Sequence, residues 1–294
     1  MLALVGIVII FGAIFGGYLF EKGNPYVLVQ PAELLIVGGA ACGIVLVANP
    51  PAAIVRMAKG AFKAFLSRPY NRATYLRSLR MLYEVFSFAQ RAGVMALEND
   101  VENPQKSRIF SHYPELLKDR ETLHFFCDSL RMLVIGVTTP HELDHLMDLD
   151  IEIQRRGQHE PVAALSSVAD ALPGLGIVAA VLGVVITMGA LGGPPEEIGH
   201  KVAAALVGTF LGILLCYGLV GPLSANMSKV ADDEHAYLYV LRVAMASFIK
   251  GTAPIMAVEV ARRAIPGHVR PTFQELESYC RNKAEGAAPK EAAA

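Results

Sequence analysis

Acidic residues are absent from the middle of the four long apolar stretches in this 294-residue sequence. The stretches cover residues 1–20, 34–50, 173–191 and 202–225. A helix needs roughly 20 apolar residues to cross the hydrocarbon core of a bilayer, so each stretch predicts a membrane-spanning helix. Proton and cation pathways through a bilayer normally contain a buried carboxylate. If this chain moves ions, another chain must supply the acid.

The sequence also lacks a large excess of basic or acidic residues, and it lacks a cysteine pattern typical of a disulfide framework. Its 26 Lys and Arg and 27 Asp and Glu are interspersed, which argues against a nucleic-acid-binding surface. Of the four cysteines, Cys42 and Cys216 fall inside predicted spans and Cys127 and Cys280 outside them, so we expect free thiols. The first stretch has neither a basic start nor a small-residue cleavage site. We therefore expect a retained span and not a secretory signal.

Lysine and arginine are distributed unevenly along the chain. Of the 26, 15 lie in residues 56–156 and nine in residues 229–290, which leaves only Lys22 and Lys201 for the two short connections between spans. Basic residues are retained on the cytoplasmic side of a membrane. We expect both large segments and both termini to be cytoplasmic, with the short connections facing outward.

These patterns predict an all-α membrane protein with four transmembrane helices and a large helical cytoplasmic domain. Between the second and third spans, apolar residues recur at helical spacing, and prolines at positions 69, 104, 114 and 140 mark expected breaks. The fourth span is expected to continue as an amphipathic helix to about residue 249. The expected segments are residues 1–50 with the first two spans, 51–170 as the cytoplasmic domain, 171–225 with the last two spans, and 226–294 as a cytoplasmic helix and tail. The tail from residue 284 has no bulky apolar residue and is expected to be disordered.

A zinc-protease pattern occurs once, as His141-Glu142-Leu143-Asp144-His145. In metalloproteases, two His on one helix face bind zinc and the Glu acts as general base. Here Pro140 places the pattern at a helix start in a charged segment, and His159 follows with no clear ligand-bearing element. We expect no metal, no cofactor and no enzyme activity.

Small residues four apart predict close helix contacts within the spans. Three pairs have this spacing: Gly12 with Gly16, Gly39 with Gly43, and Gly208 with Gly212. The contacts could lie inside one subunit or between subunits.

Two prolines and three hydroxyl-bearing residues of the last two spans are candidates for a special role. Pro173 is expected at the start of the third span, where proline is ordinary. Pro222 could act as a hinge inside a continuing helix or end the fourth span. Thr209 could meet a partner helix or bond back to its own helix carbonyl, and the same alternatives hold for Thr187 and Tyr217.

Arg91 and Glu98 are seven residues apart, which is two helical turns. On a continuous helix they would present opposite charges on one face. Such a pair is either solvated surface or a docking surface for a charged protein partner.

A collinear set of motifs gives the chain a resemblance to the MotA family of flagellar motor stator subunits over nearly its full length. The motifs are Gly16-Gly17-Tyr18-Leu19, Gln30-Pro31-Ala32-Glu33-Leu34, Leu97-Glu98 with Glu102-Asn103-Pro104, Leu146-Met147-Asp148, Leu172-Pro173-Gly174-Leu175-Gly176-Ile177-Val178-Ala179-Ala180-Val181, residues 207–215, and Ala257-Val258-Glu259. The resemblance implies a homo-oligomeric ring, a pentamer, in the lipid of the bacterial inner membrane. The ring surrounds a dimer of MotB, whose single span carries an Asp and whose periplasmic domain binds peptidoglycan.

The resemblance also implies a mechanism. Protons pass between MotB and the third and fourth spans, a segment of MotB plugs the channel before assembly, and protonation of the MotB Asp drives rotation of the ring against the rotor protein FliG. The coupling prolines correspond to Pro173 and Pro222, and the threonine beside the ion path to Thr209, with Tyr217 as a further candidate. Sodium-driven relatives place Thr where this chain has Ala180, which cannot ligate sodium, so protons are the expected ion.

The family's rotor-facing residues are an Arg and a Glu eight residues apart. Here Glu98 matches the Glu, whereas Gln90 stands at the Arg position and Arg91 follows it. The prediction is a proton-driven stator subunit. The alternative is an energy transducer of the ExbB and TolQ type, whose members have three spans and not four.

Overall fold

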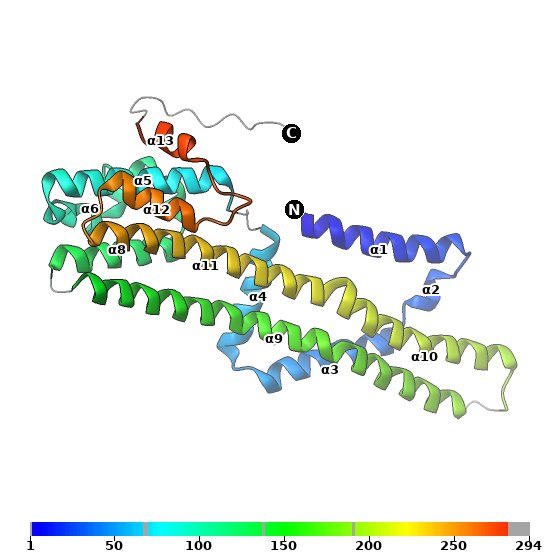
Figure 1. Ribbon diagram of the computed structural model, residues 1–294. Coiled ribbons are helices and arrows are strands. Elements are labelled where there is room, and N and C mark those ends of the chain that lie inside the picture. The colour runs from blue at the N-terminus through cyan, green and yellow to red at the C-terminus, as the bar shows by residue number, and fades with distance from the viewer. Residues whose placement is uncertain (1, 67–69, 137–138, 190–191, 282–294) are drawn as a thin grey trace. The chain divides into compact units, whose positions relative to one another are not determined.

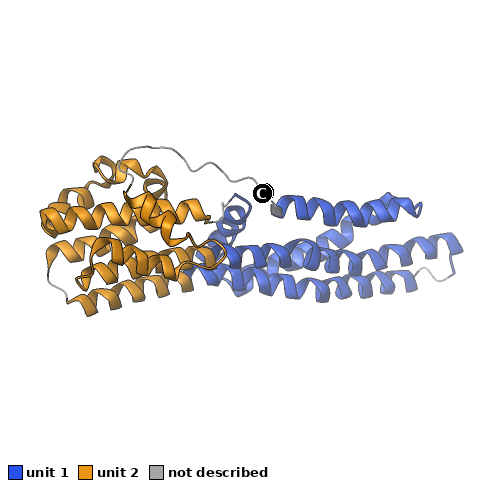
Figure 2. Ribbon diagram, turned by 45° about the horizontal axis from the view of Figure 1, so that its top comes forward, with its two compact units in different colours: residues 1–68, 157–231 blue, residues 69–156, 232–294 orange. Residues whose placement is uncertain are grey.

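The computed structural model describes residues 2–66, 70–136, 139–189 and 192–281, and every regular element in them is a helix (Figure 1). The chain divides into two compact units (Figure 2). Unit 1 comprises Met1–Arg68 and Gly157–Ala231, and unit 2 comprises Pro69–Arg156 and Asp232–Ala294. In the described part of the chain, four helical stretches are long and apolar enough to cross a membrane. The predicted all-helical fold with four candidate spans is confirmed.

Unit 1 contains the apolar helices. They are α1 (Leu2–Phe20), the single turn α2 (Pro25–Leu28), α3 (Pro31–Ala48), α4 (Pro51–Leu66), the second part of α9 (Pro140–Met188), α10 (Pro195–Leu215), the π-helical turn η4 (Cys216–Val220) and the beginning of α11 (Gly221–Ile249). Proline occupies the first turn of α2, α3 and α10, where its missing N–H breaks no helical hydrogen bond.

The two longest helical stretches do not stop where the apolar residues stop. Helix α9 continues through residue 170 with Pro161 and Pro173 in its interior, so the expectation that Pro173 begins a helix is wrong. Helix α10 continues through η4 into α11 as far as Ile249, as the amphipathic pattern predicted.

Helices α9 and α10 approach closely because glycine faces backbone at their contact. A methyl group on Gly212 would lie 2.5 Å from the carbonyl oxygen of Leu172, and one on Gly176 would lie 2.9 Å from the carbonyl oxygen of Gly208. Neither distance is possible for a real side chain. The pair Gly208 and Gly212 therefore packs inside one chain, whereas a methyl group on Gly12 would meet no described atom within 4 Å apart from the neighbouring backbone of its own helix.

Unit 2 is built around one apolar core. Its helices are α5 (Arg72–Ala92), η1 (Val94–Leu97), α6 (Glu98–Glu102), η2 (Pro104–Lys106), η3 (Phe110–His112), α7 (Pro114–Lys118), α8 (Arg120–Ile135), the first part of α9, the last part of α11, α12 (Pro254–Ala264) and α13 (Phe273–Arg281). Pro104, Pro114 and Pro140 begin helices, as predicted. Position 69 and the predicted disordered tail lie outside the described residues.

The amphipathic helix α5 supplies much of this core. Leu79, Leu82 and Phe86 are fully buried, and the Phe86 ring stacks on Phe248 of α11 with the ring centres 4.4 Å apart. Burying each such side chain stabilises the fold by about 1.5–3 kcal/mol before entropy is counted.

Charged side chains tie α11 to α9 at the edge of unit 2. Arg242 binds Asp144 at 3.0 Å and Asp148 at 2.5 Å, and Lys250 binds the second oxygen of Asp144 at 2.9 Å. The Asp144 and Arg242 side chains are mostly buried, so this network holds two helices together more firmly than isolated surface pairs would.

Candidate functional site

Pro173 and Ala180 lie seven residues apart on one face of α9, and both are half-buried. Pro173 has no N–H for the helical ladder and therefore weakens α9 at this level. The backbone nitrogen of Ala180 would lie 3.2 Å from a methyl group on Gly208. The α9 residues expected on the ion path thus lie on or beside the face that contacts α10.

Thr209 belongs to the part of α10 that packs on α9, where its Cα would lie 3.3 Å from a methyl group on Gly176. The Thr187 hydroxyl donates to the carbonyl oxygen of Gly183 at 2.8 Å, which is the expected back-bond to its own helix. Among the described residues, Thr209 forms no such side-chain hydrogen bond. Its hydroxyl therefore retains its full bonding capacity for water or another chain.

The π-helical turn η4 lies between α10 and α11. Tyr217 in this turn is 71% exposed, and Pro222 follows as the second residue of α11. The helix continues beyond Pro222 for more than six turns, so Pro222 does not end the helix. A single π turn next to proline is a local weak point of the kind often found at functional sites.

A cavity of about 230 Å³ adjoins Pro222 on the side facing α1. Its lining residues are Ala3, Gly6, Ile7, Ile10, Phe65, Pro222, Leu223 and Asn226. Asn226 donates its side-chain N–H to the carbonyl oxygen of Ala64 at 2.9 Å, which ties α11 to α4. The hinge candidate therefore has free volume beside it.

Glu33 is a buried acid that the search for carboxylates in mid-span missed. It lies in the first turn of α3 and is only 6% exposed. Its Oε2 is buried, has no hydrogen-bond partner among the described residues, and would lie 2.6 Å from a methyl group on Gly208. Because Glu33 precedes the stretch 34–50, a search restricted to the centre of each span could not find it. The sequence signal that could have identified Glu33 is an acidic residue shortly after Pro31.

A second, polar cavity of about 440 Å³ lies between α9 and α11 within unit 1. Its lining residues are His159, Val162, Ala163, Ser166, Gly221, Ser224, Ala225 and Ser228. Ser224 is buried and donates to the carbonyl oxygen of Val162 at 3.2 Å.

Arg91 and Glu98 are both exposed but do not share a helix face, so that prediction is wrong. Helix α5 ends at Ala92, Gly93 has a positive φ of 87°, and Glu98 begins the separate helix α6. Glycine adopts this φ without the steric cost that another residue would incur, and the turn redirects the chain. Arg91 donates through Nε to the carbonyl oxygen of Ser87 at 3.0 Å.

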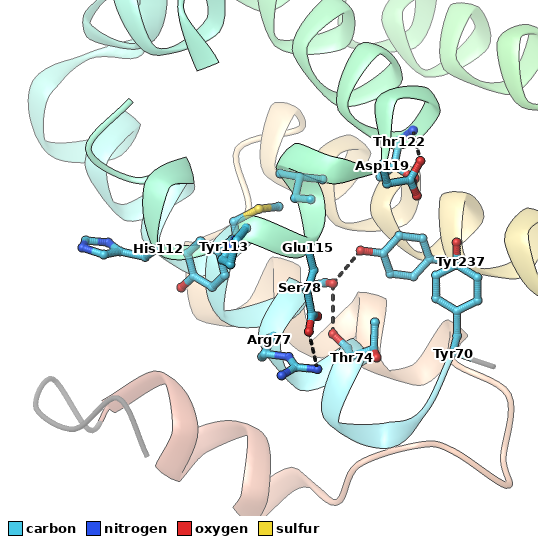
Figure 3. A pocket seen from close by; sticks show the side chains of 13 residues that line it. Tyr70, Thr74, Arg77, Ser78, His112, Tyr113, Glu115, Asp119, Thr122 and Tyr237 are labelled. Carbon is cyan, nitrogen blue, oxygen red and sulfur yellow. Dashed lines mark hydrogen bonds and ion pairs between the residues drawn. The ribbon is translucent and has the colours of Figure 1, made fainter. Parts of the chain in front are cut away.

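Unit 2 contains a cavity of about 260 Å³ bordered by α5, α7 and α11 (Figure 3). Arg77 pairs with Glu115 at 3.1 Å on one wall, and the Tyr70 ring stacks on Tyr237 on another, with the ring centres 4.5 Å apart. Ser78 donates to a backbone carbonyl oxygen 3.0 Å away, so in its 2.6 Å contact with the Tyr237 hydroxyl the phenol is the donor. Burial raises the pKa of Tyr70 above its ordinary value, so this phenol stays neutral even in alkaline solution.

The zinc-protease pattern forms a helix cap. The Glu142 carboxylate accepts a hydrogen bond from the backbone N–H of Thr139 at 2.8 Å, and the Thr139 hydroxyl accepts one from the Glu142 N–H at 3.3 Å. This reciprocal pair is a capping box at the start of α9. In the part of the chain that the structure describes, no group of three His, Cys, Asp or Glu side chains could hold a metal ion.

Comparison with known proteins agrees with this arrangement. Residues 4–93 match the family described as Motility protein A N-terminal, and residues 118–237 match the MotA/TolQ/ExbB proton channel family. Motility protein A of Escherichia coli (strain K12) is 39% identical over 285 residues, which cover 96% of this chain and 95% of that protein. Chemotaxis protein LafT of Vibrio parahaemolyticus is 33% identical over 279 residues, which cover 95% and 98%. The chain belongs to the motility protein A family.

Solved structures with the same fold are similar over most of the chain. The structure titled C. jejuni MotAB matches with a TM-score of 0.76 and 20% identity, covering 90% of this chain and 95% of that one. The flagellar MotAB stator complex from Bacillus subtilis matches with a TM-score of 0.74 and 23% identity, covering 93% and 97%.

Membership in this family decides between a stator subunit and an energy transducer of the ExbB and TolQ type. The match over residues 4–93 is to a family named for motility protein A alone, whereas the match over residues 118–237 is to a family whose name also includes TolQ and ExbB. The chain is therefore a multi-pass membrane protein of the motility protein A type. Its relatives are stator and channel proteins and not enzymes, as expected.

Proposed function

We propose that this chain is the proton-conducting stator subunit of a flagellar motor and that it works with a MotB-like single-span subunit. Besides the family of the chain, one observation supports this proposal. The candidate ion path contains no acidic residue in the middle of a span. Helices α9 and α10 bring Pro173, Ala180 and Thr209 to one contact region, but none of these residues can bind and release a proton at neutral pH. A carboxylate from a partner helix would complete the path.

The proposed ion is the proton. A dehydrated sodium ion needs several oxygen ligands. Position 180 itself offers only a methyl group and helical backbone, whereas proton transfer needs only a file of hydrogen-bonded groups. The hydroxyl of Thr209, which is not bonded to its own helix, suits such a file.

The proposed coupling element is the segment formed by η4 and Pro222. This segment contains Tyr217, it is locally weak, and a cavity leaves room for movement beside Pro222. Protonation of the partner's Asp would change the contacts of this segment, and α11 would carry the movement onward as a continuous helix.

The proposed rotor-facing residues are Arg91 and Glu98, which act on FliG. Both are exposed near the turn at Gly93, and short helices hold this turn in place through the buried residues Leu97 and Val101. A rigid turn that presents charge is a suitable contact for a complementary rotor surface.

The proposed assembly is a pentameric ring in the bacterial inner membrane with both termini in the cytoplasm. Two observations support a ring. Helix α1 has no buried residue in its apolar window, and a methyl group added to Gly12 or Gly43 would meet no described atom within 4 Å apart from the neighbouring backbone of its own helix. Small-residue surfaces of this kind suit contact with neighbouring helices.

The test is rotation in cells whose own stator genes are deleted. Expression of this chain with its MotB-like partner should restore rotation of tethered cells, because the pair converts ion flow into torque. Rotation should slow as a protonophore is titrated in and should be unchanged when external sodium is replaced by potassium. Rotation that stops without sodium would contradict the proton assignment, and absence of rotation with both chains in the membrane would contradict the stator proposal.

A further inference from the structure

The polar cavity between α9 and α11 differs chemically from the rest of unit 1. Among its eight lining residues are three hydroxyls and one imidazole, from Ser166, Ser224, Ser228 and His159, and the others are small or aliphatic. A cavity of about 440 Å³ with several polar groups is large and polar enough to hold ordered water. Water is therefore its natural occupant.

The α9 wall of the cavity continues the face that carries the expected path residues. His159 and Ser166 precede Pro173 by 14 and seven residues, and Ala180 follows by seven. Seven residues are two turns of an α-helix, with a drift of about 20°. The four side chains therefore follow one line along α9, and on this helix the cavity begins at Ser166, two turns before Pro173.

The α11 wall begins at the proposed coupling element. Gly221 follows η4 directly and lines the cavity, and Ser224 comes one turn later. Ser224 is 4% exposed and donates its proton to the carbonyl oxygen of Val162 on α9, so its oxygen still accepts hydrogen bonds. The hydroxyls of Ser166 and Ser228 form no side-chain hydrogen bond with another described residue. Three hydroxyl oxygens are thus available to water.

The far end of the cavity lies where the chain becomes charged. Glu160 follows His159 and pairs with Arg56 of α4 at 2.6 Å, and both side chains are about half exposed. Arg155 and Arg156 precede this level on α9. The cavity therefore connects the apolar part of α9 with a hydrated, charged part.

We propose that this cavity is the exit through which protons leave the ion path for the cytoplasm. The inference rests on the proposed stator function and orientation. A proton arriving at the level of Pro173 passes to a water held by Ser166 and Ser224, and each water or hydroxyl accepts one proton as it releases another. His159 accepts a proton on one ring nitrogen and releases one from the other, so every group keeps its net charge, and rotation of the hydroxyls and waters together with exchange of the imidazole tautomer resets the file.

The matched pair Ser166 and Ser167 tests the exit. Ser166 lines the cavity, whereas Ser167 is exposed and donates to the carbonyl oxygen of Ala163. Each variant is co-expressed with the MotB-like partner lacking its plug, and proton influx is followed as cytoplasmic acidification at equal membrane levels of both chains. Ser166→Leu should slow influx roughly tenfold, because an apolar side chain excludes water from a narrow path. Ser167→Leu should leave influx unchanged.

A second measurement avoids the possibility that a bulky substitution simply distorts the helices. Cys42, which is exposed, is first replaced by serine, whereas the other three cysteines are buried. Burial also raises the pKa of Cys127 to about 11 and that of Cys280 to about 12, which keeps both thiols unreactive. In this background, Ser166→Cys and Ser167→Cys are treated in inverted vesicles with a membrane-impermeant, disulfide-forming thiol reagent. The reagent should block proton flux only in Ser166→Cys, and a reductant should restore it.

The outcomes separate this proposal from the one on which it rests. Unchanged influx in Ser166→Leu together with no block of Ser166→Cys would overturn the exit while leaving the stator function in place. No influx with the unmodified chain would overturn the stator function and the exit with it.

Discussion

Two threonines in the apolar helices bond differently. Thr187 is buried and donates to the carbonyl oxygen of Gly183, so its proton stays within one helix. Thr209 is half-buried beside α9, and among the described residues its side chain forms no hydrogen bond. Only the second hydroxyl is available to another chain or to water.

This difference predicts the effect of removing each hydroxyl. Thr209→Val should reduce proton influx and motor torque severalfold, because the path loses a group that exchanges hydrogen bonds. Thr187→Val keeps the shape and removes only a bond internal to the helix, so torque should stay near the unmodified value. Rotation of tethered cells measures both variants, with membrane levels checked in parallel. Equal torque in the two variants would contradict the role of Thr209.

Glu259 is a buried acid of unit 2 whose charge is satisfied. It lies in α12, is 5% exposed, and accepts hydrogen bonds from Arg262 at 2.7 and 2.8 Å and from Arg263 at 3.0 Å. The hydrogen bonds from Arg262 hold the pKa of Glu259 below its ordinary value, and those from Arg263 add to this effect. Since the folded pKa is the lower one, this contribution to stability is present above pH 4.5 and is lost as pH falls through the folded pKa.

Glu259→Gln should therefore lower the free energy of unfolding by roughly 2 kcal/mol at neutral pH, and the difference should shrink in acid. Thermal unfolding of the detergent-solubilised protein at several pH values measures this. Glu277→Gln is the control, because Glu277 pairs with the exposed Arg281 and its loss should cost less than about 0.5 kcal/mol. A difference between Glu259→Gln and the unmodified protein that does not vary with pH would count against the ion pair as its source.

At the scale of helices, the contact of α9 with α10 depends on glycine. Gly212→Ala would place a methyl group against the backbone at Leu172 and Gly176, neither of which can move aside as a flexible side chain could. The substitution should lower the free energy of unfolding by about 1–3 kcal/mol.

Gly199→Ala is the control on the same helix. Gly199 is exposed, no described atom would lie within 4 Å of the added methyl group, and alanine favours a helix over glycine by about 0.5–1 kcal/mol. This variant should be as stable as the unmodified protein or slightly more so in thermal unfolding. If both variants unfold at the same temperature, α9 and α10 are not packed as described.

The sequence predicted helices correctly where local amino-acid composition determines them. Long apolar runs predicted the four candidate spans, and proline positions predicted the starts of η2, α7 and α9. These features are local, since apolar length decides a span and a missing N–H decides a helix start.

Features that depend on tertiary contacts were not predictable in this way. Gly93 breaks the helix between Arg91 and Glu98, although the apolar periodicity continues through it. Pro173 lies inside α9, where packing against α10 supports a helix that proline alone would interrupt. The π turn at Cys216–Val220 leaves no periodic signal at all. For the candidate site residues, the sequence therefore predicted the place of each residue along the chain better than it predicted the contacts around that residue.

At the scale of the whole molecule, we assign ion conduction and rotor contact to different units. Glu98 is exposed in unit 2, whereas the proposed ion path lies in unit 1. Glu98→Lys should abolish or strongly reduce rotation while proton influx stays normal, and a reversed charge on FliG should restore part of the rotation. Exposed Glu121, in the first turn of α8, provides the control Glu121→Lys, which should still rotate the motor. Loss of influx in Glu98→Lys would contradict the separation.

The central claim is that this chain conducts protons only together with a partner that supplies the missing carboxylate. The most direct measurement is cytoplasmic pH in cells that co-express the chain with its MotB-like partner lacking the plug. We expect acidification that disappears when the Asp in the partner's span is replaced by Asn. No acidification with both chains confirmed in the membrane, or acidification that persists without that Asp, would contradict it.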